Sequence, residues 1–147
     1  MKELRSEVTI NAPAERVWEL LTDFGSFPDW NPFMLRASGE VAVDRKLVVY
    51  LKPPGGMGMT FKPRVVKVDP NREFRWLGHL VIPGIFDGEH IFEIEPIGDP
   101  SCHFVQREEF RGILVPLMLT MIGKATERGF NEMNQALKAR AENAASG

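Results

Sequence analysis

Apolar and polar positions alternate along most of the chain, and this alternation predicts a series of strands. Residues 3–10 alternate as in a strand with one buried face. Further strands are expected at residues 35–41, 46–51, 60–68, 72–79, 86–97 and 103–111. Segments rich in Gly, Pro and Asn separate most of these strands, which indicates consecutive hairpins.

Two parts of the chain have helical spacing instead. Apolar residues recur every three to four positions from Pro13 to about Asp23, and the breaker-rich segment 25–33 predicts a short second helix with a turn. After Gly112, one apolar stripe predicts a helix to about Arg140; it consists of Leu114, Leu117, Met118, Met121, Ile122, Ala125, Met133 and Leu137. One helix can cover only one face of a sheet. The pattern therefore predicts an α+β fold in which the sheet curves around the final helix.

Length and charge narrow the class of protein. The 147 residues fit a single domain covering residues 1–147, and 44% hydrophobic with 26% charged residues is an ordinary globular composition. Because the net charge is −2 and both signs are interspersed, no nucleic-acid partner is expected. The apolar run 113–122 is shorter than the roughly 20 residues that span a bilayer, and the first residues lack a secretory signal. We therefore expect a cytoplasmic monomer or weak homodimer without a transmembrane segment.

Metal and cysteine chemistry are not expected. Cys102 is the only cysteine, so it has no partner for an intrachain disulfide or a thiol-based metal site. His79, His90 and His103 fall on separate predicted strands, and His103 is expected to face solvent. The glycine-rich segment 53–59 lacks the spacing of a phosphate-binding loop. No metal and no cofactor are predicted.

Several short segments carry a resemblance when they are taken in order. They are Ile10-Asn11-Ala12-Pro13 with Val17-Trp18, Asp29-Trp30-Asn31-Pro32, Asp69-Pro70 leading to Phe74-Arg75-Trp76, residues 88–94, and residues 104–110 followed by 112–116. Together they resemble the polyketide cyclase/dehydrase-like branch of the START-like superfamily, also called SRPBCC or Bet v 1-like. The resemblance covers nearly the whole chain.

The resemblance implies a helix-grip fold with an internal cavity. In this fold a curved antiparallel sheet of about seven strands wraps around a long C-terminal helix, and two short helices follow the first strand. Members range from lipid and hormone carriers to aromatase/cyclases, so the resemblance implies no single reaction. Gln106 stands where the family usually has a histidine on the last strand, and no catalytic residue is therefore transferred.

Strand alternation predicts a polar cluster inside the fold. His90 and Phe92 share one strand face, and Gln106, Glu108 and Phe110 share a face of the next strand. The aromatic residues mark both as covered faces, so His90, Gln106 and Glu108 are expected to point inward.

Charge on the outer face suggests how these two strands are paired. A register that sets Glu93 opposite Arg107 and Glu89 opposite Arg111 is favoured over one that sets Glu89 opposite Glu109. In the favoured register His90 faces Phe110, and His90 and Glu108 are diagonal neighbours about 7–8 Å apart at the backbone.

The polar cluster has three interpretations. The groups satisfy one another or ordered water, as buried polar groups normally do. Alternatively, His90 and Glu108 orient a hydroxyl or carbonyl of a ligand in an otherwise apolar pocket. A third interpretation makes the pair a general acid and base of a cyclase, dehydratase or hydrolase, which would be a polyketide cyclase/dehydratase-like enzyme.

We predict a protein that binds a hydrophobic or amphipathic small molecule, such as a lipid, isoprenoid or polyketide-like compound. The candidate ligand-binding residues are Trp30, Phe33, Phe61, Trp76, Phe86, His90, Phe92, Gln106, Glu108, Phe110, Met118 and Met121. For the aromatic and methionine residues, ordinary core packing is the alternative, and Trp30 equally fits an anchor of its turn.

Two loops and the outer surface give further alternatives. The segments 53–59 and 80–85 are candidate gates of a pocket, or else a flexible turn and a loop that packs against the final helix. A co-chaperone-like protein-interaction module, acting through the outer sheet face or the apolar loop, is the remaining functional class.

Overall fold

Within residues 2–80 and 82–146, which the computed structural model describes, the elements follow the order that the hydrophobic pattern predicts. Strand β1 (Lys2–Ile10) precedes α1 (Ala14–Thr22), the 3-10 turn η1 (Phe24–Ser26) and α2 (Phe27–Trp30). The later strands are β2 (Met34–Ser38), β3 (Val48–Leu51), β4 (Met59–Phe61), β5 (Arg64–Asp69), β6 (Glu73–His79), β7 (Asp87–Gly98) and β8 (Ser101–Arg111). The long helix α3 (Val115–Ser146) follows them.

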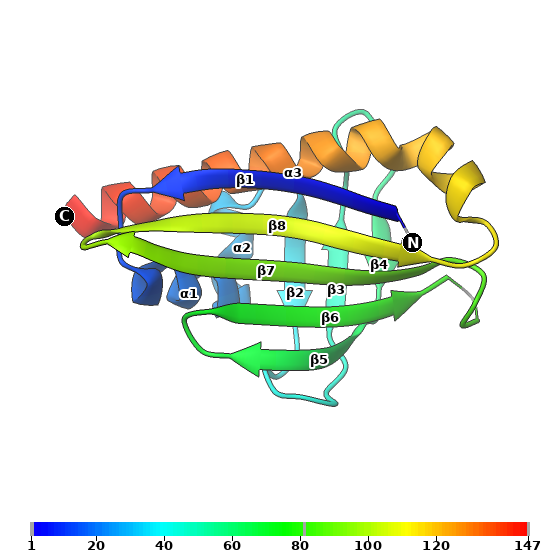
Figure 1. Ribbon diagram of the computed structural model, residues 1–147, viewed down its shortest axis with the longest axis horizontal. Coiled ribbons are helices and arrows are strands. Elements are labelled where there is room, and N and C mark those ends of the chain that lie inside the picture. The colour runs from blue at the N-terminus through cyan, green and yellow to red at the C-terminus, as the bar shows by residue number, and fades with distance from the viewer. Residues whose placement is uncertain (1, 81, 147) are drawn as a thin grey trace.

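The strands form two antiparallel sheets. One has the order β1-β8-β7-β6-β5, and the other has the order β2-β3-β4. Figure 1 shows the five-stranded sheet extending along the molecule, α3 running beside β1, and the three-stranded sheet crossing the direction of the longer strands in this view. Helix α3 packs against β1 and β8 and contacts α1 and α2. The architecture is the predicted helix-grip fold.

The strand predicted at residues 60–68 is divided into β4 and β5. Lys62 and Pro63 lie between them, and Pro63 lacks the N–H that a continuous ladder requires. The carbonyl of Pro63 instead accepts a hydrogen bond from the backbone N–H of Leu47 at 2.8 Å. An isolated bridge joins Lys46, two residues before β3, to Arg64 at the start of β5. The chain therefore changes sheet where the sequence pattern appears continuous.

The predicted register of β7 and β8 is wrong. In the structure Glu89 lies opposite Glu109, and His90 lies opposite Glu108. The prediction counted only charges that face each other directly. Arg107 instead reaches diagonally to Glu93 at 2.8 Å and along its own strand to Glu109 at 2.7 Å, so the like charges are compensated from the side. The correction brings His90 and Glu108 directly opposite each other.

The two halves of α3 differ in how they pack. Phe130, Met133, Leu137 and Ala141 are fully buried, with the spacing of one helical face. Gly129 lies against the ring of Phe33, and a Cβ at that position would overlap the ring. In the first half, by contrast, Leu117 and Met121 are exposed. The core is therefore most complete beneath the second half of the helix.

No helix in the described ranges combines the length and the apolar composition that crossing a bilayer requires.

Candidate functional site

A chain of hydrogen bonds crosses the space between the sheet and α3. His90 on β7 and Gln106 on β8 are both buried, and His90 Nε2 lies 2.9 Å from Gln106 Oε1. Gln106 Nε2 donates to Asn134 Oδ1 at 2.8 Å, and Asn134 Nδ2 donates to Ser6 Oγ at 3.0 Å. The Ser6 hydroxyl donates to Asn131 Oδ1. The predicted polar cluster is thus extended to α3 and β1.

Sequence reasoning missed Asn134 and Ser6, although each left a signal. Asn134 is a polar residue beside Met133 on the buried face of α3, and Ser6 occupies an inward position between Leu4 and Val8 on β1. A polar residue at an inward position normally requires a partner. The two residues are 128 positions apart, so the sequence did not indicate that they are each other's partners.

His90 lies in an aromatic surrounding. Its ring centroid is 5.3 Å from that of Trp76, 4.7 Å from that of Phe92 and 5.1 Å from that of Phe130, the last in an edge-to-face arrangement. These contacts hold the plane of the imidazole while Gln106 holds its Nε2 atom. The orientation of the Nδ1 atom is therefore fixed as well.

Glu108 lies at the Nδ1 side of this imidazole. Its Oε1 atom is 3.6 Å from His90 Nδ1, and its side chain is 20% exposed whereas that of His90 is 4% exposed. The other carboxylate oxygen, Oε2, lies over Gly88, where an added Cβ would overlap it. The buried polar chain therefore ends in a carboxylate that is accessible to solvent.

The predicted ligand residues divide into three groups by exposure. Phe33, Trp76, His90, Phe92, Gln106 and Phe110 are buried; Trp30, Phe61, Phe86, Glu108 and Met118 are half-buried; and Met121 is 70% exposed. Phe86 stacks on Phe110 with ring centroids 5.2 Å apart. Met121 thus lies on the surface of α3 and not among the buried members. The candidate gate at residues 80–85 includes Val81, which lies outside the described residues.

The segment around Trp30 contains polar atoms that are not paired. Asn31 Oδ1 accepts hydrogen bonds from the backbone N–H groups of Phe33 and Met34, which fixes the turn after α2. Among the described residues, Trp30 Nε1 and Asn31 Nδ2 are buried without a hydrogen-bond partner. The Trp30 ring meets Phe27 edge to face at 5.5 Å, so it also anchors the turn.

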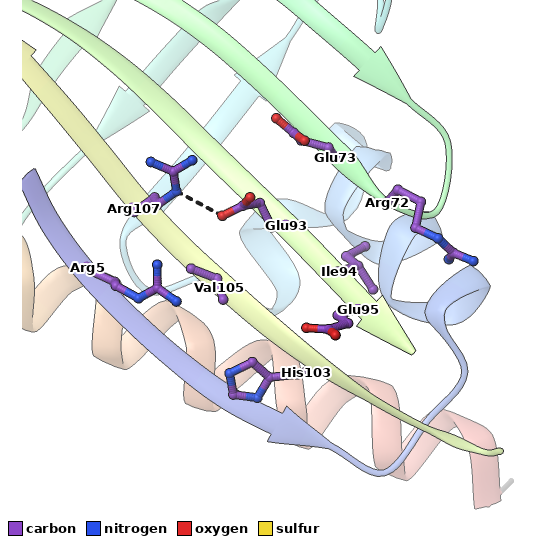
Figure 2. Close-up of a pocket in the computed structure, with 9 residues that line it drawn as sticks. All are labelled: Arg5, Arg72, Glu73, Glu93, Ile94, Glu95, His103, Val105 and Arg107. Carbon is purple, nitrogen blue, oxygen red and sulfur yellow. Dashed lines mark hydrogen bonds and ion pairs between the residues drawn. The ribbon is translucent and has the colours of Figure 1, made fainter. Parts of the chain in front are cut away.

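Two recesses of the surface lie elsewhere. One, of about 450 Å³, is on the outer face of the five-stranded sheet, and the other, of about 420 Å³, lies between η1 and the three-stranded sheet beside Arg36 and Tyr50. None of the predicted ligand residues lines either recess. Figure 2 shows the first recess, where the ion pair of Arg107 and Glu93 lies near Arg5, and Glu95 and His103 lie further along the strands.

Ion pairs determine the electrostatics of this outer face. Burial lowers the pKa of Arg107, but hydrogen bonds to Glu93 and Glu109 outweigh it and the pKa is raised. Burial similarly tends to raise the pKa of Glu73, but hydrogen bonds from Arg75 and Lys67 bring it below its usual value. The charges here are compensated by neighbours, which is a structural role.

The remaining histidines and the cysteine lie apart from one another. His79 Nδ1 is 2.8 Å from Asp87 Oδ1, and this hydrogen bond lowers the pKa of Asp87. His103 lies on the outer face, 3.6 Å from Glu7. Burial raises the pKa of the Cys102 thiol to about 11, with a contribution from the charge of Glu15. Over the described residues, no three His, Cys, Asp or Glu side chains are grouped so that they would hold a metal ion.

Comparison with known families assigns the chain. The family model described as polyketide cyclase / dehydrase and lipid transport matches residues 1–142. The chain belongs to this family. The match agrees with the resemblance carried by the sequence segments and with the helix-grip architecture. No sequence among the curated proteins matches this chain.

Solved structures support the same fold. The Zhui aromatase/cyclase from Streptomyces sp. R1128 has a TM-score of 0.77 at 17% identity, over 96% of this chain and 93% of that one. A START superfamily protein from Mycobacterium smegmatis has a TM-score of 0.71 at 19% identity, over 97% and 98% of the two chains.

A larger relative shares the fold over part of its length. The di-domain aromatase/cyclase BexL from the BE-7585A biosynthetic pathway has a TM-score of 0.76 at 17% identity. The match covers 97% of this family member but 47% of BexL, so the chain spans about half of that protein. At these identities the likeness concerns the fold alone.

Proposed function

We propose that this protein binds a hydrophobic or amphipathic small molecule between the five-stranded sheet and the first half of α3. In this proposal Glu108 is the polar anchor, and His90 and Gln106 hold it in place. Apolar contacts supply most of the affinity, because burial of apolar surface contributes about 25 cal/mol per Å². The family description, which includes lipid transport, agrees with this class of ligand.

The observation that carries the proposal is the position of Glu108. A carboxylate is normally excluded from an apolar interior unless it is paired. Here it ends a buried polar chain, remains 20% exposed, and lies on the same sheet face as Phe92 and Phe110. A few fixed polar groups on an apolar surface are the usual composition of a small-molecule site.

Side chains must move for a ligand to enter. Phe86 and Met118 are half-buried, and they are the proposed movable wall on the accessible side of Glu108. Met118 is flexible, so it adapts to different ligand shapes at little strain. The fully buried residues on the second half of α3, such as Phe130 and Met133, form the part of the proposed site that does not move.

The first test is direct identification of a ligand. The protein is purified from its native host and denatured, and the released small molecules are identified by mass spectrometry. The compounds found, together with lipids and aromatic polyketides, are then screened for a rise in melting temperature. We expect a released apolar compound that also stabilises the protein. An empty protein that no apolar compound stabilises would contradict the proposal and favour the protein-interaction alternative.

Matched variants locate the site. Replacing Met118 with Trp fills the proposed entrance and should weaken binding of the identified compound. Replacing Leu117 with Trp, one residue earlier on the exposed face of α3, should leave binding unchanged. Equal effects of the two substitutions would argue against entry beside Met118.

The pairing of His90 with Glu108 favours a second candidate function. A histidine and a carboxylate 3.6 Å apart, held in an apolar surrounding, have the composition of a general acid and base pair. If the protein is an enzyme of this kind, replacing Glu108 with Gln should abolish turnover and leave affinity largely intact. Loss of affinity alone would favour a carrier.

A further inference from the structure

We infer that the site selects ligands that carry a hydroxyl group and places that hydroxyl as a donor to Glu108 Oε2. The inference rests on the proposed function and adds the polar chemistry of the ligand. A phenol or an alcohol would be bound more tightly than the matching ether.

The first step is the direction of the buried hydrogen bonds. Asn134 Nδ2 donates to Ser6, and Asn134 Oδ1 accepts from Gln106 Nε2. Gln106 therefore presents its Oε1 atom to His90, so that His90 Nε2 is the donor in their 2.9 Å contact. In a neutral imidazole the Nδ1 atom then carries the lone pair, and it faces Glu108 Oε1.

The second step concerns the Oε1 atom of Glu108. Oε1 lies 3.6 Å from His90 Nδ1, so it is the carboxylate oxygen that faces the imidazole. If every amide of the chain were reversed, His90 Nε2 would accept from Gln106 and Nδ1 would carry the hydrogen. In each arrangement Oε1 is the oxygen that faces His90.

The third step is the remaining oxygen. Among the described residues, Oε2 has no hydrogen-bond donor, and it occupies the position that a Cβ atom on residue 88 would take. Because Oε1 is the oxygen that faces His90, Oε2 is the acceptor that is left for a ligand. A ligand group that meets Oε2 must therefore be a donor, and a hydroxyl is the donor that fits an otherwise apolar molecule. An ether or a ketone would present a second acceptor.

The experiment compares two probes of nearly equal shape, 2-naphthol and 2-methoxynaphthalene. Their dissociation constants are measured by calorimetry with the full chain. We expect wild-type protein to bind 2-naphthol at least about tenfold more tightly, since hydrogen bonds to charged groups are among the stronger ones. In Glu108→Met, which removes the acceptor at similar side-chain length, the two constants should agree within about twofold.

Two further variants separate position from charge. Glu95→Met removes an exposed carboxylate from the outer face of β7 and should keep the wild-type preference. Gly88→Ala keeps the carboxylate but displaces Oε2, and it should lower the preference for 2-naphthol at least threefold. Circular dichroism and melting temperature establish that each variant is folded.

The outcomes distinguish this inference from the function on which it rests. Equal binding of both probes by wild-type protein, or a preference that survives in Glu108→Met, would overturn the hydroxyl selection and leave the apolar ligand site standing. If neither naphthalene binds and no lipid stabilises the protein, both proposals fail. A preference that is lost in Glu108→Met and in Gly88→Ala but kept in Glu95→Met supports the inference.

Discussion

Polar side chains are paired differently on the two faces of strands β7 and β8. On the outer face, Arg107 contacts Glu3, Glu93 and Glu109, and Arg75 contacts Glu73 and Glu89, so each of the two arginines has more than one acidic neighbour. On the inner face, His90 and Gln106 belong to a single chain in which each amide has a fixed partner. An outer arginine that loses one ion pair keeps another, whereas an inner amide that loses its hydrogen bond has no alternative partner in the chain.

The difference teaches where each type of contact is useful. Outer charges remain in contact with water, so individual ion pairs contribute little. Their side-chain stems also cover apolar surface: Ile91 faces outward between Arg75 and Arg107 and is nevertheless fully buried. Inner polar groups are desolvated, so an unpaired one is expensive. The inner face is therefore the one on which we propose that a ligand is oriented.

The largest effect is expected from the apolar part of the inner face. Phe92 is 1% exposed and contacts the rings of Trp76 and His90. Phe92→Ala should lower the free energy of unfolding in urea by about 3–5 kcal/mol, because it leaves a cavity. Phe61→Ala, at a half-buried position, is the control and should lower the free energy of unfolding by a smaller amount. A loss below about 1 kcal/mol at Phe92 would contradict the packing described here.

A smaller effect is expected where the polar chain is broken. Gln106→Leu leaves His90 Nε2 and Asn134 Oδ1 without their partner, and should cost about 2–3 kcal/mol in the free energy of urea unfolding. Ser101→Ala, which removes an exposed hydroxyl bond to Asn11, is the control and should change the free energy little. Unchanged stability of Gln106→Leu would mean that the chain serves orientation alone.

The outer face should respond less, and its response should depend on salt. Arg107→Met keeps most of the aliphatic part of the side chain over Ile91 and removes the charge. We therefore expect the free energy of unfolding to fall by about 1 kcal/mol at low ionic strength. Salt near 1 M should reduce this loss, whereas it should not change that of Gln106→Leu. Urea unfolding at two salt concentrations checks both. Equal salt dependence of the two variants would break the distinction between the faces.

The smallest effect is a pH dependence on the outer face. Burial tends to raise the pKa of Glu73, but hydrogen bonds from Arg75 and Lys67 hold this pKa below its usual value of 4.5. A depressed pKa adds stability above pH 4.5 that disappears as the pH falls through the folded-state value. The free energy of unfolding of wild type should exceed that of Glu73→Gln by less than about 1 kcal/mol at pH 7. This difference should disappear below pH 4.5. A gap that widens in acid would contradict the assignment.

The site was only partly predictable from the sequence. Strand alternation placed His90, Gln106 and Glu108 on one covered face, because side chains on a strand have a period of two regardless of what surrounds them. It did not reveal that Met121 is exposed, because the helical stripe on α3 is continuous in the sequence while the packing beneath it is not. Pro63 is the signal in the sequence for the division of β4 from β5, because proline cannot donate to a strand ladder.

The sequence by itself determined the order of the elements and which residues share a face, since both follow from local periodicity. Only the tertiary structure decided the register of β7 and β8, because diagonal contacts of Arg107 compensate charges that a pairwise count leaves opposed. The tertiary structure also decided the partners of the buried polar groups. Ser6 and Asn134 meet because α3 packs along β1, and no local pattern encodes a contact between residues 128 positions apart.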